Sequence, residues 1–181
     1  QRKSRRAVYK VALIGYTNAG KSTLMNQLTG AQTLVENKLF ATLDSTIRKI
    51  KKNFPFPIIL SDTVGLINKL PHDLVASFKS TLDEIRDADL LLKVVDISDP
   101  NSSRQMETTT VVINELGVEK TDSLLVFNKI DKLTDPETLQ MEVQKKPEAI
   151  TISSKNATGL DELCSAIINS YEKKLALFRV S

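Results

Sequence analysis

Residues 15–22 read Gly15-Tyr16-Thr17-Asn18-Ala19-Gly20-Lys21-Ser22, and this stretch decides the fold. It matches the pattern G-x-x-x-x-G-K-[ST]. An apolar stretch at 8–14 predicts a strand before it, and a helical pattern at 21–28 follows it. In this setting the loop N–H groups and the helix N-terminus point at phosphate oxygens, whereas a glycine-rich turn before an ordinary helix is disfavoured. We predict that these residues and Thr23 cradle phosphates, with Lys21 at the β- and γ-phosphates and Ser22 on Mg²⁺.

Strands and helices alternate along the rest of the chain. Predicted strands span 47–53, 58–61, 90–95, 123–127 and 149–152, and predicted helices span 73–86, 105–116, 136–145 and 160–177. Residues 30–46 show no period and are expected to form a loop, and Ile47 and Ile50 are expected to face inward. The order predicts an α/β P-loop NTPase fold with three α/β/α layers, whose mostly parallel six-stranded sheet has one antiparallel edge strand.

Ligands of such sheets bind outside the carboxyl ends of the strands, so the polar motifs after strands should converge. Asp62-Thr63-Val64-Gly65 follows the strand at 58–61. Asp62 is placed to hold Mg²⁺ through a water, and the Gly65 N–H to meet the γ-phosphate. The pattern D-x-x-G is weak alone, and its position in the order makes it informative.

A threonine from a switch loop should complete the metal site. The segment Phe40-Ala41-Thr42-Leu43-Asp44-Ser45-Thr46 lies between the two motifs. Thr42 and Thr46 are both candidates for a hydroxyl on Mg²⁺ and an N–H on the γ-phosphate. Loss of that phosphate would release the segment. An ordinary mobile loop is the alternative for this stretch.

Asn128-Lys129-Ile130-Asp131 follows the strand at 123–127 and predicts the nucleotide base. Two Asp131 oxygens match the two donors at N1 and N2 of guanine, whereas adenine would leave the carboxylate unpaired. Asn128 can bridge the base and the phosphate loop, and the Lys129 stem can cover the base. Ser153-Ser154-Lys155 follows the last strand and is expected to offer a backbone N–H to guanine O6. The sequence therefore predicts GTP and GDP, and disfavours an ATPase or a kinase.

Composition sets broader limits. The chain has 181 residues, is 41% apolar and has a net charge of +3, which suits one globular domain with no DNA partner. The single cysteine, Cys164, excludes an internal disulfide, and no apolar run reaches the length of a membrane span. We expect a cytoplasmic monomer.

Five motifs together resemble HflX-type proteins, translation-factor-class GTPases that associate with the large ribosomal subunit. These motifs are G-Y-T-N-A-G-K-S-T-L at 15–24, L-F-A-T-L-D at 39–44, D-T-V-G at 62–65, L-P-H-D-L-V at 70–75 and A-S-F-K-S-T-L at 76–82. The resemblance spans residues 1–165. It implies that Thr42 is the magnesium ligand and that Phe40 to Asp44 line the nucleotide. It also implies that residues 1–7 are a linker from an absent N-terminal domain and 8–181 the GTP-binding domain.

Two positions depart from the family pattern. Ser45 stands where Pro is common, and Ser154 stands where Ala is common. Little effect is expected from Ser154. The expected catalytic groups are Lys21, Thr42 and Gly65. Many GTPases place a water-orienting Gln after D-x-x-G, and here that residue is Leu66. We therefore predict slow hydrolysis. The group that orients the attacking water could come from a partner, from His72 or from Arg48. A module that binds GTP and scarcely hydrolyses it is the rival hypothesis.

Overall fold

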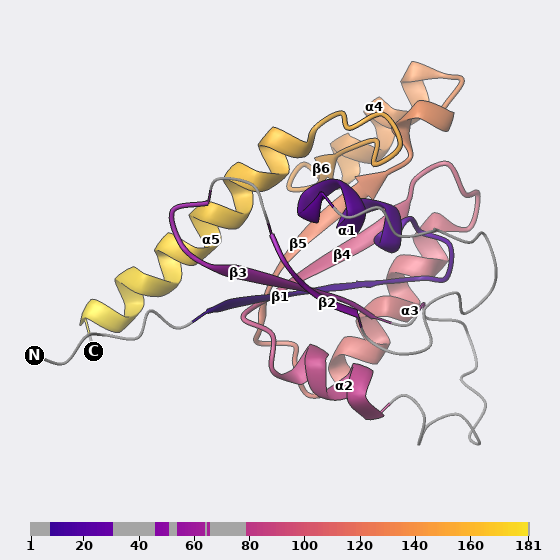
Figure 1. Ribbon diagram of the computed structural model, residues 1–181. Helices are drawn as coiled ribbons and strands as arrows, with labels where there is room; N and C mark the ends of the chain where they lie inside the picture. Colours follow the sequence, from indigo (N-terminus) through magenta and orange to yellow (C-terminus); the bar gives the residue numbers. More distant parts are fainter. Residues whose placement is uncertain (1–7, 31–45, 51–53, 64, 66–78, 181) are drawn as a thin grey trace, which may run out of the picture.

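The computed structural model describes residues 8–30, 46–50, 54–63, 65 and 79–180 (Figure 1). Several predictions concern residues outside these ranges: the linker at 1–7, the switch residues Phe40, Ala41, Thr42, Leu43 and Asp44, and also Val64, Leu66 and His72. The fold and the site below are built from the described residues alone.

One sheet of six strands runs through the centre of the molecule (Figure 1). The strands are β1 (Tyr9–Gly15), β2 (Thr46–Lys49), β3 (Ile58–Asp62), β4 (Leu90–Asp96), β5 (Asp122–Asn128) and β6 (Ile150–Thr151). They lie in the order β2-β3-β1-β4-β5-β6, with β2 antiparallel to β3 and the other neighbours parallel. The predicted sheet with an antiparallel edge strand is confirmed. Because the chain crosses from β3 over β1 to β4, β1 lies beside the point where the strand order reverses, which is where such sheets bind ligands.

Helices cover both faces of the sheet (Figure 1). They are α1 (Lys21–Thr29), α2 (Lys79–Arg86), α3 (Ser102–Glu115), α4 (Pro136–Lys145) and α5 (Leu160–Val180), with a 3₁₀ turn, η2, at Ile130–Lys132. On one face α1 and α5 pack on alternate apolar residues such as Val11 and Leu13. On the other face α2 and α3 pack on Ala12 and Ile14. The alternation along β1 thus separates two apolar cores and gives the three expected layers.

The start of helix α3 differs from the sequence prediction for a physical reason. Helix α3 begins at Ser102 rather than at residue 105. Its first turn is polar, so hydrophobic periodicity does not detect it. The Asp99 carboxylate accepts hydrogen bonds from the Asn101 backbone N–H and from Gln105 Nε2, and so supports that turn. Of the helix predicted at 73–86, residues 79–86 are described and form α2, whereas the predicted start at 73 lies outside the described residues.

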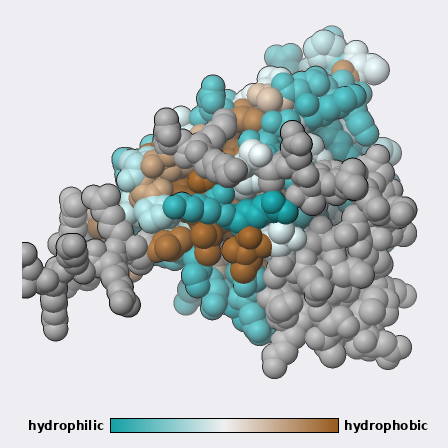
Figure 2. All heavy atoms as spheres, viewed as in Figure 1, coloured by the Kyte–Doolittle hydropathy of each residue, from teal (hydrophilic) through white to brown (hydrophobic). Residues whose placement is uncertain are grey.

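The expectation that Ile47 faces inward is wrong. Ile47 lies in the edge strand β2 opposite Ser61 and is 47% exposed, whereas Ile50 is buried and its N–H donates to Ile58 O. Residues three apart in an extended chain point to opposite faces, so the two isoleucines cannot both point into one core. In Figure 2 hydrophobic and hydrophilic residues both reach the surface around this edge of the sheet, in keeping with exposed Ile47 and Lys49.

Candidate functional site

The phosphate loop, residues 15–22, connects β1 to α1. Gly20 precedes the helix with a φ of +96°, and no side chain caps the helix N-terminus. The first N–H groups of α1 are therefore available to an anion, and a left-handed backbone at Gly20 favours glycine. Space requires glycine there too, because a Cβ would lie 2.3 Å from Asn128 Nδ2.

Lys21 is buried at the base of this loop. Its Nζ donates to Tyr16 O at 3.1 Å and to Gly15 O at 3.4 Å, so backbone carbonyls hold the ammonium over the loop. Burial lowers the pKa of Lys21 to about 8, against the opposing effect of Asp62 and with a further lowering by Lys129. An ammonium that has lost much of its hydration is primed for a phosphate, which would supply the missing negative charge.

Two oxygen donors meet where β3 ends beside the start of α1. Asp62 is the last residue of β3 and only 3% exposed, and the Ser22 hydroxyl donates to its Oδ2. The Thr63 hydroxyl donates to Leu13 O and so ties the chain leaving β3 to β1. A hydroxyl and a carboxylate are ligands that Mg²⁺ prefers, so this donor set fits the ion. Thr42, the third expected ligand, lies outside the described residues, and Thr46 begins β2 opposite Asp62.

Gly65 packs directly on the phosphate loop. A Cβ at this position would lie 2.6 Å from Thr17 Cα and 3.0 Å from Thr17 N, so only glycine permits the contact. The sequence argument expected Gly65 to offer its N–H to a γ-phosphate and did not include this packing. The contact brings the end of the Asp62–Gly65 motif against the loop that would hold the phosphates.

Asn128 joins three loops at the end of β5. Its side chain is 1% exposed, and its Nδ2 donates to Ala19 O at 2.9 Å. Its Oδ1 accepts from the Ser154 backbone N–H at 3.0 Å and from the Ser154 hydroxyl at 2.9 Å. The predicted bridge from Asn128 to the phosphate loop is therefore present. The second bond comes from the Ser154 hydroxyl, so an alanine at this position could not make it.

Ser153 holds the carboxylate that was predicted to read the base, that of Asp131. Its hydroxyl lies 2.6 Å from Asp131 Oδ1 and accepts from the Asn156 N–H at 3.1 Å. Asp131 itself is exposed, so its carboxylate remains accessible to a base. The Ser153 N–H donates to Thr158 O, and the Ser154 N–H is occupied by Asn128. The prediction was that one backbone N–H from Ser153, Ser154 and Lys155 would face guanine O6, and only the N–H of Lys155 has no acceptor in the described part of the chain.

Lys129 crosses from the base-recognition loop, residues 128–131, to the phosphate loop. Its Nζ donates to Asn18 O at 2.6 Å and lies 2.7 Å from Asp96 Oδ2. The Asp96 contact was not predicted, because a lone carboxylate at the end of an apolar strand matches no nucleotide motif. Its position at the carboxyl end of β4 was the available signal.

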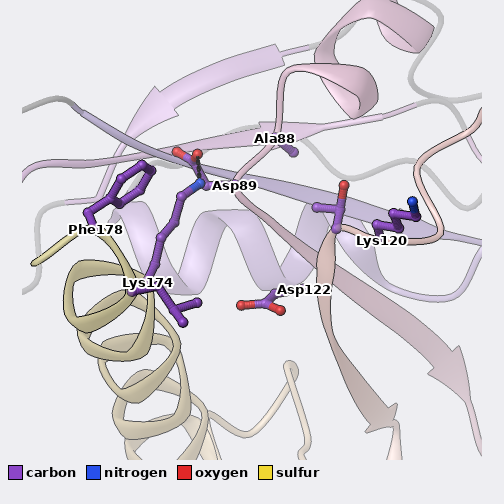
Figure 3. A pocket seen from close by; sticks show the side chains of 8 residues that line it. Ala88, Asp89, Lys120, Asp122, Lys174 and Phe178 are labelled. Atoms are coloured by element: carbon purple, nitrogen blue, oxygen red, sulfur yellow. Dashed lines mark hydrogen bonds and ion pairs between the residues drawn. The ribbon is translucent and has the colours of Figure 1, made fainter. Parts of the chain in front are cut away.

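A cavity lies at the opposite end of the sheet from this site, and Figure 3 shows the side chains that line it. This cavity of about 440 Å³ is lined by residues that include Asp89, Asp122, Lys174 and Phe178. Asp89 precedes β4, Asp122 begins β5, and the Lys174 ammonium pairs with the Asp89 carboxylate. The cavity is thus at the amino ends of the strands and takes no part in the site described above.

Three motifs therefore lie at one carboxyl edge of the sheet: the phosphate loop, Asp62 and the loop at residues 128–131. Their order is that of a P-loop GTP-binding domain. A family model described as 50S ribosome-binding GTPase matches residues 10–129. The chain belongs to this family, and its GTPase domain is of the HflX type.

The similar proteins support the family and the HflX type. GTPase HflX of Gluconacetobacter diazotrophicus is 49% identical over 175 residues, which is 97% of this chain and 39% of the relative. This chain thus spans about two fifths of the curated relatives it matches. A crystal structure of an Era variant from Aquifex aeolicus, bound to GDP and AlF₄⁻, has a TM-score of 0.74 and 26% identity over 90% of this chain and 56% of that one. Era with MgGDPNP and part of 16S ribosomal RNA has a TM-score of 0.72 and 28% identity, with the same coverage.

No helix among the described residues is long and apolar enough to cross a membrane.

Proposed function

We propose that this chain binds GTP and GDP with Mg²⁺, hydrolyses GTP slowly and acts as a switch on the large ribosomal subunit. The observation that carries the proposal is the buried Asn128 side chain, which is hydrogen bonded to Ala19 and to Ser154. It places the base-recognition loop at a fixed distance from the phosphate loop. A nucleotide that spans both loops would be held at its base and at its phosphates.

Guanine recognition rests on chemistry that adenine cannot match. The Asp131 carboxylate, oriented by Ser153, would accept from N1–H and from the 2-amino group, and the Lys155 N–H would donate to O6. The Lys129 stem would cover one face of the base. Adenine would place its 6-amino group opposite the Lys155 N–H and would offer no donors to Asp131. Polar groups that the bound base covers would then stay unpaired, which is the costly kind of mismatch.

The phosphates and the metal would lie between α1 and the end of β3. Ser22, Thr42 and Asp62 are the proposed magnesium ligands, Asp62 acting through a water, and Lys21 would reach the β- and γ-phosphates. The bound ion would neutralise charge on the β- and γ-oxygens. The Era structure with MgGDPNP, at 28% identity, supports the same nucleotide and ion here.

Slow hydrolysis follows from the residue after the D-x-x-G motif, which is Leu66. Lys21, Thr42 and Gly65 would stabilise charge on the transferred phosphoryl group, because an ammonium and backbone N–H groups can donate to its oxygens. Leu66 can neither accept from nor donate to the attacking water. Arg48, in β2 opposite Leu60, and His72 remain candidates for an internal substitute. A ribosomal contact is the more economical source of the missing group, since it would couple hydrolysis to binding.

Partner and location are proposed from the relatives. The family description names the 50S subunit, and the HflX relatives are longer than this chain. We propose a cytoplasmic protein whose GTPase domain acts as a monomer, with contacts to the large subunit that involve further parts of the whole protein.

Phosphate release from GTP, with and without Mg²⁺ and large ribosomal subunits, tests the proposal. Unstimulated Ras turns over at about 10⁻⁴ s⁻¹, and we expect a rate of that order here, with loss of activity in EDTA and acceleration by the subunits in a full-length protein. A rate of about 10 s⁻¹, typical of a metabolic enzyme, would contradict the slow switch. Tight GTP binding with no phosphate release under any condition would favour the rival binding module.

A further inference from the structure

The carboxyl end of β4 carries a carboxylate that has no part in the nucleotide motifs. Asp96 is the last residue of β4 and lies opposite Asn128 in the register with β5. Its Oδ2 is 2.7 Å from the Lys129 ammonium, and the side chains of Lys129 and Asp96 are 19% and 15% exposed. Because both side chains are largely shielded from solvent, salt screens this pair less than a surface ion pair.

Asp96 is itself held in place by its own strand and loop. Its Oδ1 accepts from the Ser98 N–H at 3.0 Å and from the Ser98 hydroxyl at 2.5 Å. The next backbone N–H, that of Ile97, donates to Asn128 O at 3.1 Å. The position of the carboxylate is therefore set by the β4–β5 ladder and the turn after it.

Lys129 transmits this position to the phosphate loop. Its Nζ donates to Asn18 O at 2.6 Å, and a Cβ on Gly20 would lie 3.7 Å from its Cε, so the stem runs along the loop. A lysine side chain loses much rotamer freedom when it is fixed. A carboxylate that fixes it before the nucleotide arrives leaves less ordering to be done on binding.

We propose that Asp96 is a positioning residue for nucleotide binding, which holds the Lys129 ammonium against Asn18 so that the lysine stem already forms one wall of the base site. The inference rests on the GTP and GDP binding proposed above. Asp96 acts through Lys129 and touches no nucleotide atom. It therefore sets how tightly a nucleotide is held, while the choice of guanine belongs to Asp131.

A double-mutant cycle on the dissociation of fluorescent GDP tests this role. Asp96→Ala should speed dissociation about tenfold, the usual effect of losing a charged hydrogen-bond partner. In the Lys129→Ala background the same change should have less than about a twofold effect, because the group it acts through is gone. The preference for GDP over xanthosine diphosphate should stay unchanged. A merely structural role would predict equal losses in both backgrounds.

Asp99→Ala is the matched control, since it removes a carboxylate from the same turn. The Asp99 carboxylate accepts from Asn101 and Gln105, so we expect less than about a twofold change in GDP dissociation. Asp96→Asn keeps the shape and tests the charge if Asp96→Ala fails to fold, with an expected acceleration of about threefold. An unchanged rate in the folded Asp96 variants, or additive losses in the cycle, would overturn the inference. Failure of the wild-type chain to bind GDP would instead overturn the proposed function, and this inference with it.

Discussion

At the scale of single residues, the site depends on polar groups that are hydrogen bonded before any ligand arrives. Lys21 is held by backbone carbonyls, Asn128 by Ala19 and Ser154, and Asp131 by Ser153. Groups held in this way need little reorganisation when a nucleotide binds, so each contact contributes more to affinity than a mobile side chain would.

Nucleotide affinity should fall as pH rises above 8. Burial lowers the pKa of Lys21 to about 8 in the nucleotide-free protein, and phosphate oxygens would raise it again. Binding above that pH therefore requires proton uptake. The charged fraction of Lys21 drops from about nine tenths at pH 7 to about a quarter at pH 8.5, so GDP affinity should weaken about fourfold. Titration calorimetry in two buffers measures affinity and proton uptake, and affinity that is flat over this range would contradict a pKa of about 8.

Asp131→Asn should exchange guanine for xanthine specificity. The amide keeps one acceptor and replaces the other with a donor, which suits the 2-oxo group of xanthine and repels the 2-amino group of guanine. GDP affinity should fall about a hundredfold or more, and affinity for xanthosine diphosphate should rise. Competition against fluorescent GDP and xanthosine diphosphate measures both. The argument fails if the variant still prefers GDP by the wild-type ratio.

At the scale of elements, the site is a set of strand ends. The ends of β1, β3 and β5 supply the phosphate loop, the Asp62 carboxylate and Asn128, and β4 adds Asp96. Motif spacing predicts the first three because each motif follows an apolar run. It could not predict the Asp96–Lys129 pair or the contact of Gly65 with Thr17, because both depend on how separate strands are aligned in space. The start of α3 was missed for the opposite reason, since its first turn is polar and lacks any period.

Ser154→Ala should loosen the junction between the last strand and the phosphate loop. It removes the hydroxyl that donates to Asn128 Oδ1 at 2.9 Å in a site where Ser154 is 2% exposed. The backbone N–H bond remains, so we expect a loss of about 1 kcal/mol, seen as about fivefold faster GDP dissociation. The sequence argument expected little effect at this position. Ser165→Ala, which removes an exposed hydroxyl from α5, is the control, and equal rates for the two variants would show that the extra bond is not used.

At the scale of the whole molecule, α5 closes one face of the sheet and reaches back to β1 and the segment before β3. The Tyr9 hydroxyl lies 3.0 Å from Ser170 Oγ, and the Tyr171 ring stacks on Phe56 with centroids 3.5 Å apart. The helix predicted at 160–177 is confirmed as α5, because a long amphipathic helix has a clear period, although Leu175 on the stripe expected to pack inward is 38% exposed. Helix and sheet together hold the strand ends of the site in register.

Ile167→Ala should therefore lower stability without changing base preference. Ile167 is fully buried between α5 and the sheet, and its truncation should cost about 2–5 kcal/mol of unfolding free energy. Leu177→Ala, at a position 74% exposed near the end of the same helix, should cost less than about 0.5 kcal/mol. Denaturant unfolding compares the two. A change in the ratio of GDP to ADP affinity in the folded Ile167 variant would show that packing, and not Asp131, sets the base preference.

Competition between GTP and ATP for the nucleotide-free chain, with fluorescent GDP as the probe and Mg²⁺ present, tests the central claim most directly. The account predicts that GTP displaces the probe at concentrations at least about a thousandfold below those needed for ATP, because adenine leaves the Asp131 carboxylate and the Lys155 N–H unpaired. Displacement by ATP and GTP at equal concentrations would contradict the assignment of this edge of the sheet to guanine nucleotides.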